Sequence, residues 1–123
     1  MAMYGGPAER KTLNKPDETR NFPKGKLEVV TIGETTIGRA EFQPGWKWSE
    51  CMKSIAGTES CQAAHLGYCI SGRMAILTDD GQQIEFGPGD AMWIPPGHDA
   101  WIVGNDPCVL VDFTGFADYA KPH

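Results

Sequence analysis

Turn-forming residues break this sequence at short intervals, and that spacing constrains the fold more than any other feature. The 123 residues include 15 Gly and 9 Pro. Turn signals occur at Asp79–Gly81, Gly87–Gly89, Pro95–Gly97 and Asn105–Pro107. Gly and Pro set the backbone angles of tight turns and are unfavourable inside helices. Since no stretch of about ten residues before the C-terminal tail has a helical period, the pattern predicts an all-β chain.

Short apolar or alternating segments fill the intervals between these turns, as expected for strands. The segments predicted as strands are Leu27–Ile32, Thr35–Phe42, Cys51–Ile55, His65–Ile70, Arg73–Thr78, Gln83–Phe86, Ala91–Ile94, Ala100–Val103 and Cys108–Thr114. About nine strands at this spacing are typical of a β-sandwich or β-barrel.

The length suits one domain, because a second core would need more chain. We expect an N-terminal arm over residues 1–26, a barrel over residues 27–115 and a C-terminal tail over residues 116–123, with a turn of helix at Phe116–Ala120. The arm is polar, and its apolar residues follow neither a strand nor a helix period. The sequence leaves open whether the arm is disordered or lies on a partner subunit as an extra strand.

Charge and composition exclude several partners. The formal net charge is -5, with acidic and basic residues mixed along the chain, which argues against a nucleic-acid partner. No apolar run approaches the ~20 residues that cross a bilayer, and the N-terminus lacks the apolar core of a signal peptide. We therefore expect no membrane association and a cytoplasmic protein, in which the 4 Cys are not disulfide-bonded.

Two segments resemble the signatures of the cupin superfamily. Gly87–Gly97, with the sequence GPGDAMWIPPG, closely resembles the second signature, a glycine, five residues and then PxG. His65–Met74 resembles the end of the first signature, with His65 in the place of its acidic residue. The resemblance covers residues 42–113 and is strongest to small stand-alone bacterial cupins. It implies a single cupin-type double-stranded β-helix, that is, a jelly-roll barrel.

The chain departs from the family pattern at the metal ligands. Glu59 and Cys61 stand nearest to the two histidines of the first signature. In the second signature, Ala100 stands at the histidine position and His98 directly follows Gly97. The usual set of three histidines and one glutamate therefore does not carry over.

The residues that replace this set still predict a metal site. Glu59, Cys61 and His65 share the parity that places side chains on one side of an extended segment, and His98 shares the parity of Ala100. We expect Cys61, His65 and His98 to hold a divalent transition metal, with Glu59 as fourth ligand or general base. Zinc is favoured because it accepts sulfur and nitrogen, and iron, nickel and manganese are further candidates. In the alternative, no metal binds, Cys61 packs in the core and the histidines hydrogen-bond an organic ligand or water.

Four other residues are candidates for supporting roles. Trp48 and Trp101 flank the signature segments and are expected to line the pocket, unless they are simply core. Arg73 can pair with a ligand carboxylate or with a surface aspartate. Asp99 is expected to orient the neighbouring His98 without itself binding the metal, or else to cap a turn.

These features predict a small cupin that binds a metal and a small organic molecule inside the barrel. Such a protein could be an isomerase, lyase, hydrolase or dioxygenase, and the sequence leaves the reaction open. No GxSxG motif, phosphate loop, dinucleotide fingerprint or nucleophile with a neighbouring base is evident. The alternative is a non-catalytic small-molecule-binding or sensor module without metal. The resemblance also implies a two-fold homodimer.

Overall fold

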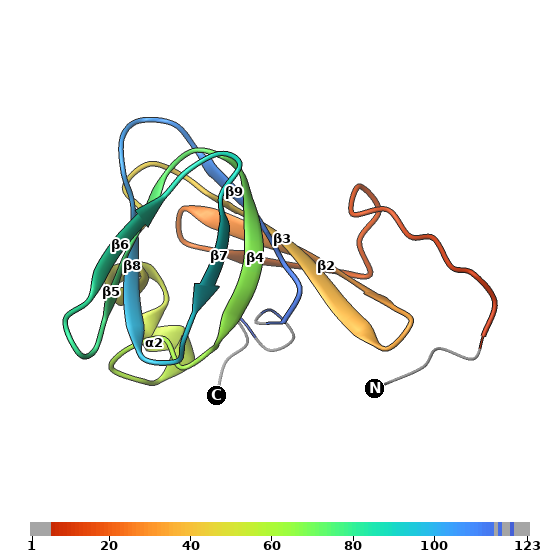
Figure 1. The fold of residues 1–123 in the computed structure, drawn as a ribbon, viewed down its shortest axis with the longest axis horizontal. Helices are drawn as coiled ribbons and strands as arrows, with labels where there is room; N and C mark the ends of the chain where they lie inside the picture. The colour runs from red at the N-terminus through yellow and green to blue at the C-terminus, as the bar shows by residue number, and fades with distance from the viewer. Residues whose placement is uncertain (1–5, 115, 117–118, 120–123) are drawn as a thin grey trace.

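The computed structural model describes residues 6–114, 116 and 119 of the chain (Figure 1). Among these residues the strands are β1 (Glu18–Phe22), β2 (Gly25–Ile32), β3 (Thr35–Phe42), β4 (His65–Ser71), β5 (Met74–Thr78), β6 (Gln83–Phe86), β7 (Ala91–Ile94), β8 (His98–Ile102) and β9 (Cys108–Asp112). Two short helices, α1 (Trp48–Cys51) and α2 (Lys53–Ala56), lie between β3 and β4.

The strands form two antiparallel sheets around a common interior. One sheet has six strands in the order β1-β2-β3-β9-β4-β7, and the other has three strands in the order β6-β5-β8. β9 lies between β3 and β4, so strands far apart in the sequence are neighbours. Figure 1 shows β5, β6 and β8 on one side of the barrel and β4, β7 and β9 on the other. This arrangement confirms the prediction of an all-β jelly-roll barrel.

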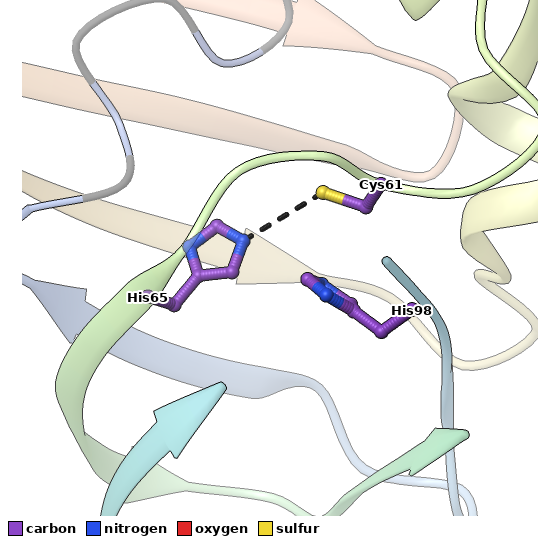
Figure 2. A group of neighbouring side chains, drawn as sticks. All are labelled: Cys61, His65 and His98. Carbon is purple, nitrogen blue, oxygen red and sulfur yellow. Dashed lines mark hydrogen bonds between the residues drawn. The ribbon is translucent and has the colours of Figure 1, made fainter. Parts of the chain in front are cut away.

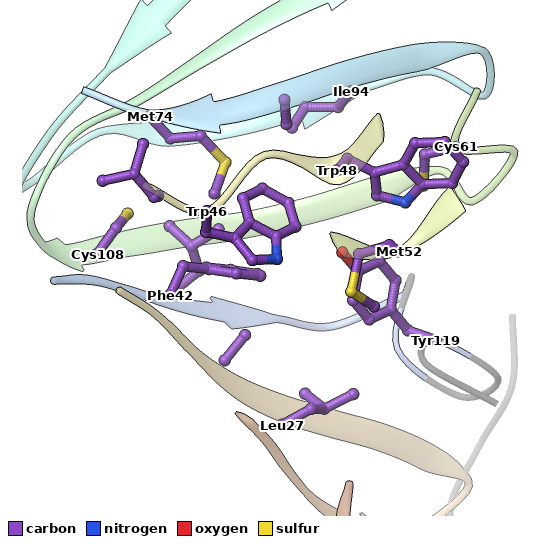
Figure 3. Close-up of a cluster of buried hydrophobic side chains, with 14 of the residues drawn as sticks. Leu27, Phe42, Trp46, Trp48, Met52, Cys61, Met74, Ile94, Cys108 and Tyr119 are labelled. Atoms are coloured by element: carbon purple, nitrogen blue, oxygen red, sulfur yellow. The ribbon is translucent and has the colours of Figure 1, made fainter. Parts of the chain in front are cut away.

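The inward-facing side chains of the strands, which alternate with outward-facing ones, fill the interior. In β4 the buried residues are every second one from His65, and in β8 the buried residues are every second one from His98. In β9 Leu110 and Asp112 face inward. Because side chains of a strand alternate between two faces, each of these strands gives one face to the barrel interior. Figure 3 shows the large buried side chains there, including Phe42, Trp46 and Trp48.

The prediction of a strand over Cys51–Ile55 is wrong, because α1 and α2 occupy this segment. Trp48, Cys51 and Met52 are all buried, at the spacing of three and four residues that places side chains on one side of a helix. Gly57 ends α2 in the left-handed conformation, with φ 75°. Helices of four residues are too short to show a helical period over a longer window.

Part of the N-terminal segment lies in the sheet. β1 pairs with β2 from Glu18↔Val29 to Phe22↔Gly25, within the 1–26 segment read as an arm. Only Arg20 and Phe22 of this edge strand are buried, so its pattern of apolar residues is too sparse to indicate a strand. That residues before β1 contact a partner subunit stays a prediction, and most of the helical turn predicted over Phe116–Ala120 lies outside the described residues.

Candidate metal centre

Cys61, His65 and His98 come together at one end of the barrel (Figure 2). Each is buried and offers one ligand atom, and these atoms all lie within 4.8 Å of one another. The Cys61 Sγ is 3.8 Å from the His65 Nε2, and the ring centroids of His65 and His98 are 5.3 Å apart. Figure 2 shows the three side chains converging from separate segments of the chain. The structure thus contains a group of side chains that could hold a metal ion.

Backbone hydrogen bonds bring Cys61 next to His98. The Cys61 N–H donates to the His98 carbonyl at 2.7 Å, and the Gly97 N–H donates to the Cys61 carbonyl at 2.7 Å. Gly97 has φ 87°, in the left-handed region that favours glycine. A Cβ at Gly97 would also meet the Asp79 Oδ2 at 2.7 Å. The PxG turn therefore places His98 next to Cys61.

Hydrogen bonds orient both imidazoles. The His98 Nδ1 lies 2.9 Å from the Pro95 carbonyl oxygen, which can only accept, so Nδ1 carries the proton. The His65 Nδ1 lies 2.6 Å from the Asp112 Oδ2 and donates to that carboxylate. In the neutral form each ring then has its lone pair on Nε2, the nitrogen left to bind a metal.

Asp112 is a functional residue that sequence reasoning missed. It is buried at the end of β9 and also accepts a hydrogen bond from the Thr114 N–H at 2.8 Å. A carboxylate that accepts the second ring N–H of a ligating histidine is a common support for metal sites. In the sequence, Asp112 could be placed on the inward face only by its parity with Leu110. Its contact with His65 follows from the pairing of β9 with β4.

The electrostatics couple Cys61 to His65. Burial alone would raise the pKa of the Cys61 thiol, but the hydrogen bonds and charges of His65 and His98 outweigh burial and lower this pKa to about 6. Burial alone would lower the pKa of His65, but its hydrogen bonds to Asp112 and Cys61 raise this pKa to about 9. The metal-free site therefore favours a thiolate next to an imidazolium, and the thiolate is the form of cysteine that binds metals.

Two members of the cluster, His65 and His98, line a cavity of about 30 Å³ inside the barrel. One water-sized sphere needs about 10–15 Å³ on this scale, so the space suits a very small guest. His65, His98, Asp112 and Tyr119 are its titratable lining residues, and most of the wall is apolar. The lining residues are Phe42, Trp46, Trp48, His65, Met74, Ile76, Met92, Ile94, His98, Ala100, Leu110, Asp112, Phe116 and Tyr119.

Glu59 does not join the cluster, which corrects the expectation that it would be a fourth ligand or general base. Its side chain is 93% exposed and pairs with Lys53 at 2.7 Å. The parity argument failed because residues 57–60 form turns and bends after α2 rather than an extended strand. Parity held for Cys61, which forms a β-bridge with His98.

Of the four supporting candidates, Trp48 lines the cavity and the other three do not. Trp101 lies on the outward side of β8, with the Lys47 Nζ 5.6 Å from its ring centroid. The Arg73 side chain is 54% exposed and pairs with Glu85. Neither Trp101 nor Arg73 lines the cavity, which corrects the expectation that they would contact a ligand there.

Asp99 also faces away from the cluster. Its carboxylate accepts hydrogen bonds from the Ser49 N–H and hydroxyl, at 3.0 and 2.9 Å, and so ties β8 to α1. Adjacent residues of a strand point to opposite faces, so Asp99 cannot orient the ring of His98. The carboxylate that does support a histidine of the cluster is Asp112.

The distance between the sulfur and nitrogen atoms of Cys61 and His65 is compatible with a tetrahedral metal ion. With Zn–S near 2.3 Å and Zn–N near 2.0 Å, sulfur and nitrogen ligands of tetrahedral zinc lie roughly 3.5 Å apart. The observed 3.8 Å between the Cys61 Sγ and the His65 Nε2 needs only a small contraction. Three protein ligands leave one position of a tetrahedron open, and the cavity adjoins the two histidines.

A jelly-roll barrel with a cluster of possible metal ligands inside it is an arrangement found in cupins, and the comparisons agree. Residues 57–114 match the family model described as a cupin domain. The chain therefore resembles the small domains of the cupin superfamily, by sequence over this segment and by fold over the described barrel. No protein with a curated description matches it.

Solved structures support the fold alone, because their sequence identities are low. A protein of unknown function from Rhizobium leguminosarum bv. viciae has 18% identity and a TM-score of 0.58 over 96% of this chain and 100% of its own. The polyketide cyclase RemF from Streptomyces resistomycificus has 16% identity and a TM-score of 0.60 over 88% of this chain and 79% of its own. An oxalate decarboxylase from Bacillus subtilis has 17% identity and a TM-score of 0.60, over 89% of this chain but 30% of its own.

Within the described part of the chain, no helix has the length and apolar character needed to cross a membrane.

Proposed function

We propose that this cupin holds a divalent transition metal, with zinc favoured, through Cys61, His65 and His98, and acts on a small organic molecule inside the barrel. The observation that carries the proposal is the convergence of the three ligand atoms within 4.8 Å in a buried site. The Nε2 atoms of both histidines are kept available by the hydrogen bonds of their Nδ1 atoms. The set of one sulfur and two nitrogens suits zinc.

Each residue of the site has a separate task. Cys61 supplies a negative ligand, and Asp112 keeps the ring of His65 turned toward it. The wall of the cavity beside the two histidines is mainly apolar. A bound metal with an open position can polarise a carbonyl group or lower the pKa of a bound water. This arrangement favours a catalytic function for the site.

Metal analysis of protein purified without a histidine tag tests the proposal. We expect about one equivalent of a transition metal in the wild-type protein and a large loss in Cys61→Ser and His98→Ala. Cys51→Ser is the matched control, because Cys51 is also a buried free thiol but lies outside the cluster. Wild-type protein that takes up less than about a tenth of an equivalent, even after incubation with Zn²⁺, would contradict the proposal and favour a metal-free binding module.

One observation favours a second candidate function, a nucleophilic thiol. Cys61, His65 and Asp112 form a chain of contacts, 3.8 Å from sulfur to ring and 2.6 Å from ring to carboxylate. This is the order of nucleophile, base and orienting carboxylate found in cysteine hydrolases, and the sequence did not reveal that Cys61 has a neighbouring base. The two functions need the same sulfur, so they exclude each other in one molecule.

Alkylation of Cys61 separates the two candidates. In metal-free protein we expect iodoacetamide to modify Cys61 before the other thiols, and saturating Zn²⁺ to block that modification. If Zn²⁺ leaves the rate unchanged while Cys61 remains reactive, the thiol rather than a metal centre is the functional group.

A further inference from the structure

Phe116 and Tyr119 come after the last strand of the barrel and still belong to its interior. They are 3% and 8% exposed, and both line the cavity beside His65. The ring centroid of His65 lies 5.5 Å from that of Phe116 and 5.8 Å from that of Tyr119. Two aromatic side chains therefore form the part of the wall next to a candidate metal ligand.

The two rings fit closely into the barrel. Their centroids are 5.1 Å apart, and a Cβ added at Gly38 of β3 would overlap the Phe116 ring. Burial raises the pKa of the Tyr119 hydroxyl, and nearby charges, first that of Cys61, raise it further. Tyr119 therefore lies near the sulfur of the cluster as well as beside His65.

Arg20 of β1 holds both residues in place. Its Nη1 donates to the Phe116 carbonyl at 3.0 Å and to the Tyr119 carbonyl at 2.7 Å. Its Nε and Nη2 donate to the carboxylate of Glu18 at 2.8 and 3.0 Å. Because a guanidinium carries five N–H donors in a rigid fork, one buried arginine can hold all these acceptors at once.

The site needs an opening before it can admit a ligand. Cys61, His65 and His98 are only 4%, 8% and 3% exposed. The cavity of about 30 Å³ has room for about two water-sized spheres. An organic molecule needs more space, so part of the wall must move. This step rests on the proposed function, which places such a molecule inside the barrel.

Phe116 and Tyr119 are the part of this wall that can move without breaking a sheet. Most of the other lining residues belong to strands that pair with their neighbours. Trp46 is tied to β8, since its carbonyl accepts from the Ile102 N–H at 3.0 Å. Phe116 and Tyr119 lie outside the strands, so moving them breaks the hydrogen bonds from Arg20 and the ring contacts but leaves both sheets intact. Segments that open locally at low cost often give access to buried sites.

We propose that ligands enter the barrel at the place that Phe116 and Tyr119 occupy, and that Arg20 is a positioning residue that holds these two side chains against the site. In the closed arrangement the rings shield His65 and Cys61. In the open arrangement they move aside and leave their volume to the ligand.

Alkylation of the thiols by iodoacetamide in metal-free protein tests the inference, with each cysteine quantified by mass spectrometry. Cys61 reports on the site. Cys108 reports on global unfolding, because it begins β9 at the end opposite Asp112 and is 0% exposed. Figure 3 shows these two cysteines on different sides of the buried cluster. Local opening exposes Cys61 alone, whereas unfolding exposes both.

Substitutions of Arg20 should change the reactivity of Cys61. Arg20→Gln weakens the hold on the two carbonyls, so we expect Cys61 to react about three- to tenfold faster while Cys108 stays protected. Arg20→Lys keeps a donor for both carbonyls and should stay within about twofold of wild type. Arg39→Gln is the matched control, because Arg39 also pairs with a glutamate and donates to a backbone carbonyl, at the N-terminal segment. An unchanged rate at Cys61 in Arg20→Gln, or an equal acceleration at Cys108, would overturn the inference.

The wild type gives a second measurement that does not depend on the folding of a variant. A local opening exposes less surface than global unfolding, so the alkylation rate of Cys61 should rise less steeply with urea than that of Cys108. Equal slopes would mean that Cys61 is reached only through global unfolding, and the proposed entry would be wrong.

The outcome separates this inference from the proposed function. If Zn²⁺ binds but the reactivity of Cys61 does not respond to Arg20→Gln, the entry fails and the metal site stands. If Arg20→Gln exposes Cys61 but no metal binds, the entry is supported and the proposed metal function fails.

Discussion

At the scale of single residues, Asp112 is the least obvious member of the site. Its hydrogen bond fixes the tautomer of His65, so we predict that Asp112→Asn lowers the affinity for Zn²⁺ about 10- to 100-fold. Asp99→Asn is the matched control, because Asp99 also accepts hydrogen bonds but on the outer face. Competition with a chromophoric chelator measures both variants. Equal affinities of Asp112→Asn and wild type would show that the carboxylate does not support the metal.

Metal binding should depend on pH through His65. The pKa of His65 is raised to about 9, so below that pH a metal must displace a proton from the ring. The pKa of Cys61 is lowered to about 6, so at higher pH the thiolate is already present. We therefore predict that the affinity for Zn²⁺ rises about tenfold per pH unit from pH 7 and levels off near pH 9. Calorimetry in several buffers measures the released proton, and a flat profile would contradict this reading.

Residue patterns in the sequence identified the three side chains of the cluster but not the carboxylate of Asp112 that supports it. Parity along extended segments found Cys61, His65 and His98, because strand alternation is a local property. Parity misled at Glu59, because the chain turns there. Asp112 could not be assigned, since its contact with His65 depends on β9 pairing with β4, which is a property of the whole sheet.

At the scale of elements, β4 and β9 form the framework of the site. They approach closely at Gly67, where an added Cβ would overlap the Val111 carbonyl oxygen. We predict that Gly67→Ala lowers the free energy of unfolding by about 2 kcal/mol through overpacking. Gly6→Ala, where a Cβ meets nothing within 4 Å, should stay within about 0.5 kcal/mol of wild type. Urea unfolding measures both variants. A Gly67→Ala protein as stable as wild type would show that β4 and β9 can move apart at Gly67 without loss of stability.

Most strands of the barrel were predictable, because turns of Gly, Pro and Asp delimit them in the sequence. β1 was missed because only two of its residues are buried. The helices α1 and α2 were missed because four-residue helices carry too few apolar positions to outweigh a reading as a strand. The order of strands in the sheets was not predictable from the residues, because it depends on contacts between distant segments.

At the scale of the whole molecule, the outer face of β4 carries a row of large apolar residues at every second position, Leu66, Tyr68 and Ile70, beside Trp93 of β7, which is 59% exposed. Exposed apolar patches of this kind mark interaction surfaces. The cupin resemblance implies a homodimer, and we propose that a second copy covers this face.

Sedimentation equilibrium tests this proposal. We predict twice the mass of one chain for the wild type and a monomer for the Leu66→Glu, Ile70→Glu double variant. Ile84→Glu changes an apolar residue that is also exposed but lies in β6 of the other sheet, so it should remain dimeric. A monomeric wild type at micromolar concentration would refute the dimer, and a dimeric double variant would place the interface elsewhere.

The central claim is that one sulfur and two imidazole nitrogens of this barrel bind a metal ion together. X-ray absorption at the metal edge of Zn²⁺-loaded protein tests it most directly, because the spectrum counts the ligands by type and distance. We predict one sulfur at about 2.3 Å and two imidazole nitrogens at about 2.0 Å, with the sulfur lost in Cys61→Ser. A shell of nitrogen and oxygen alone, unchanged by that substitution, would contradict the account.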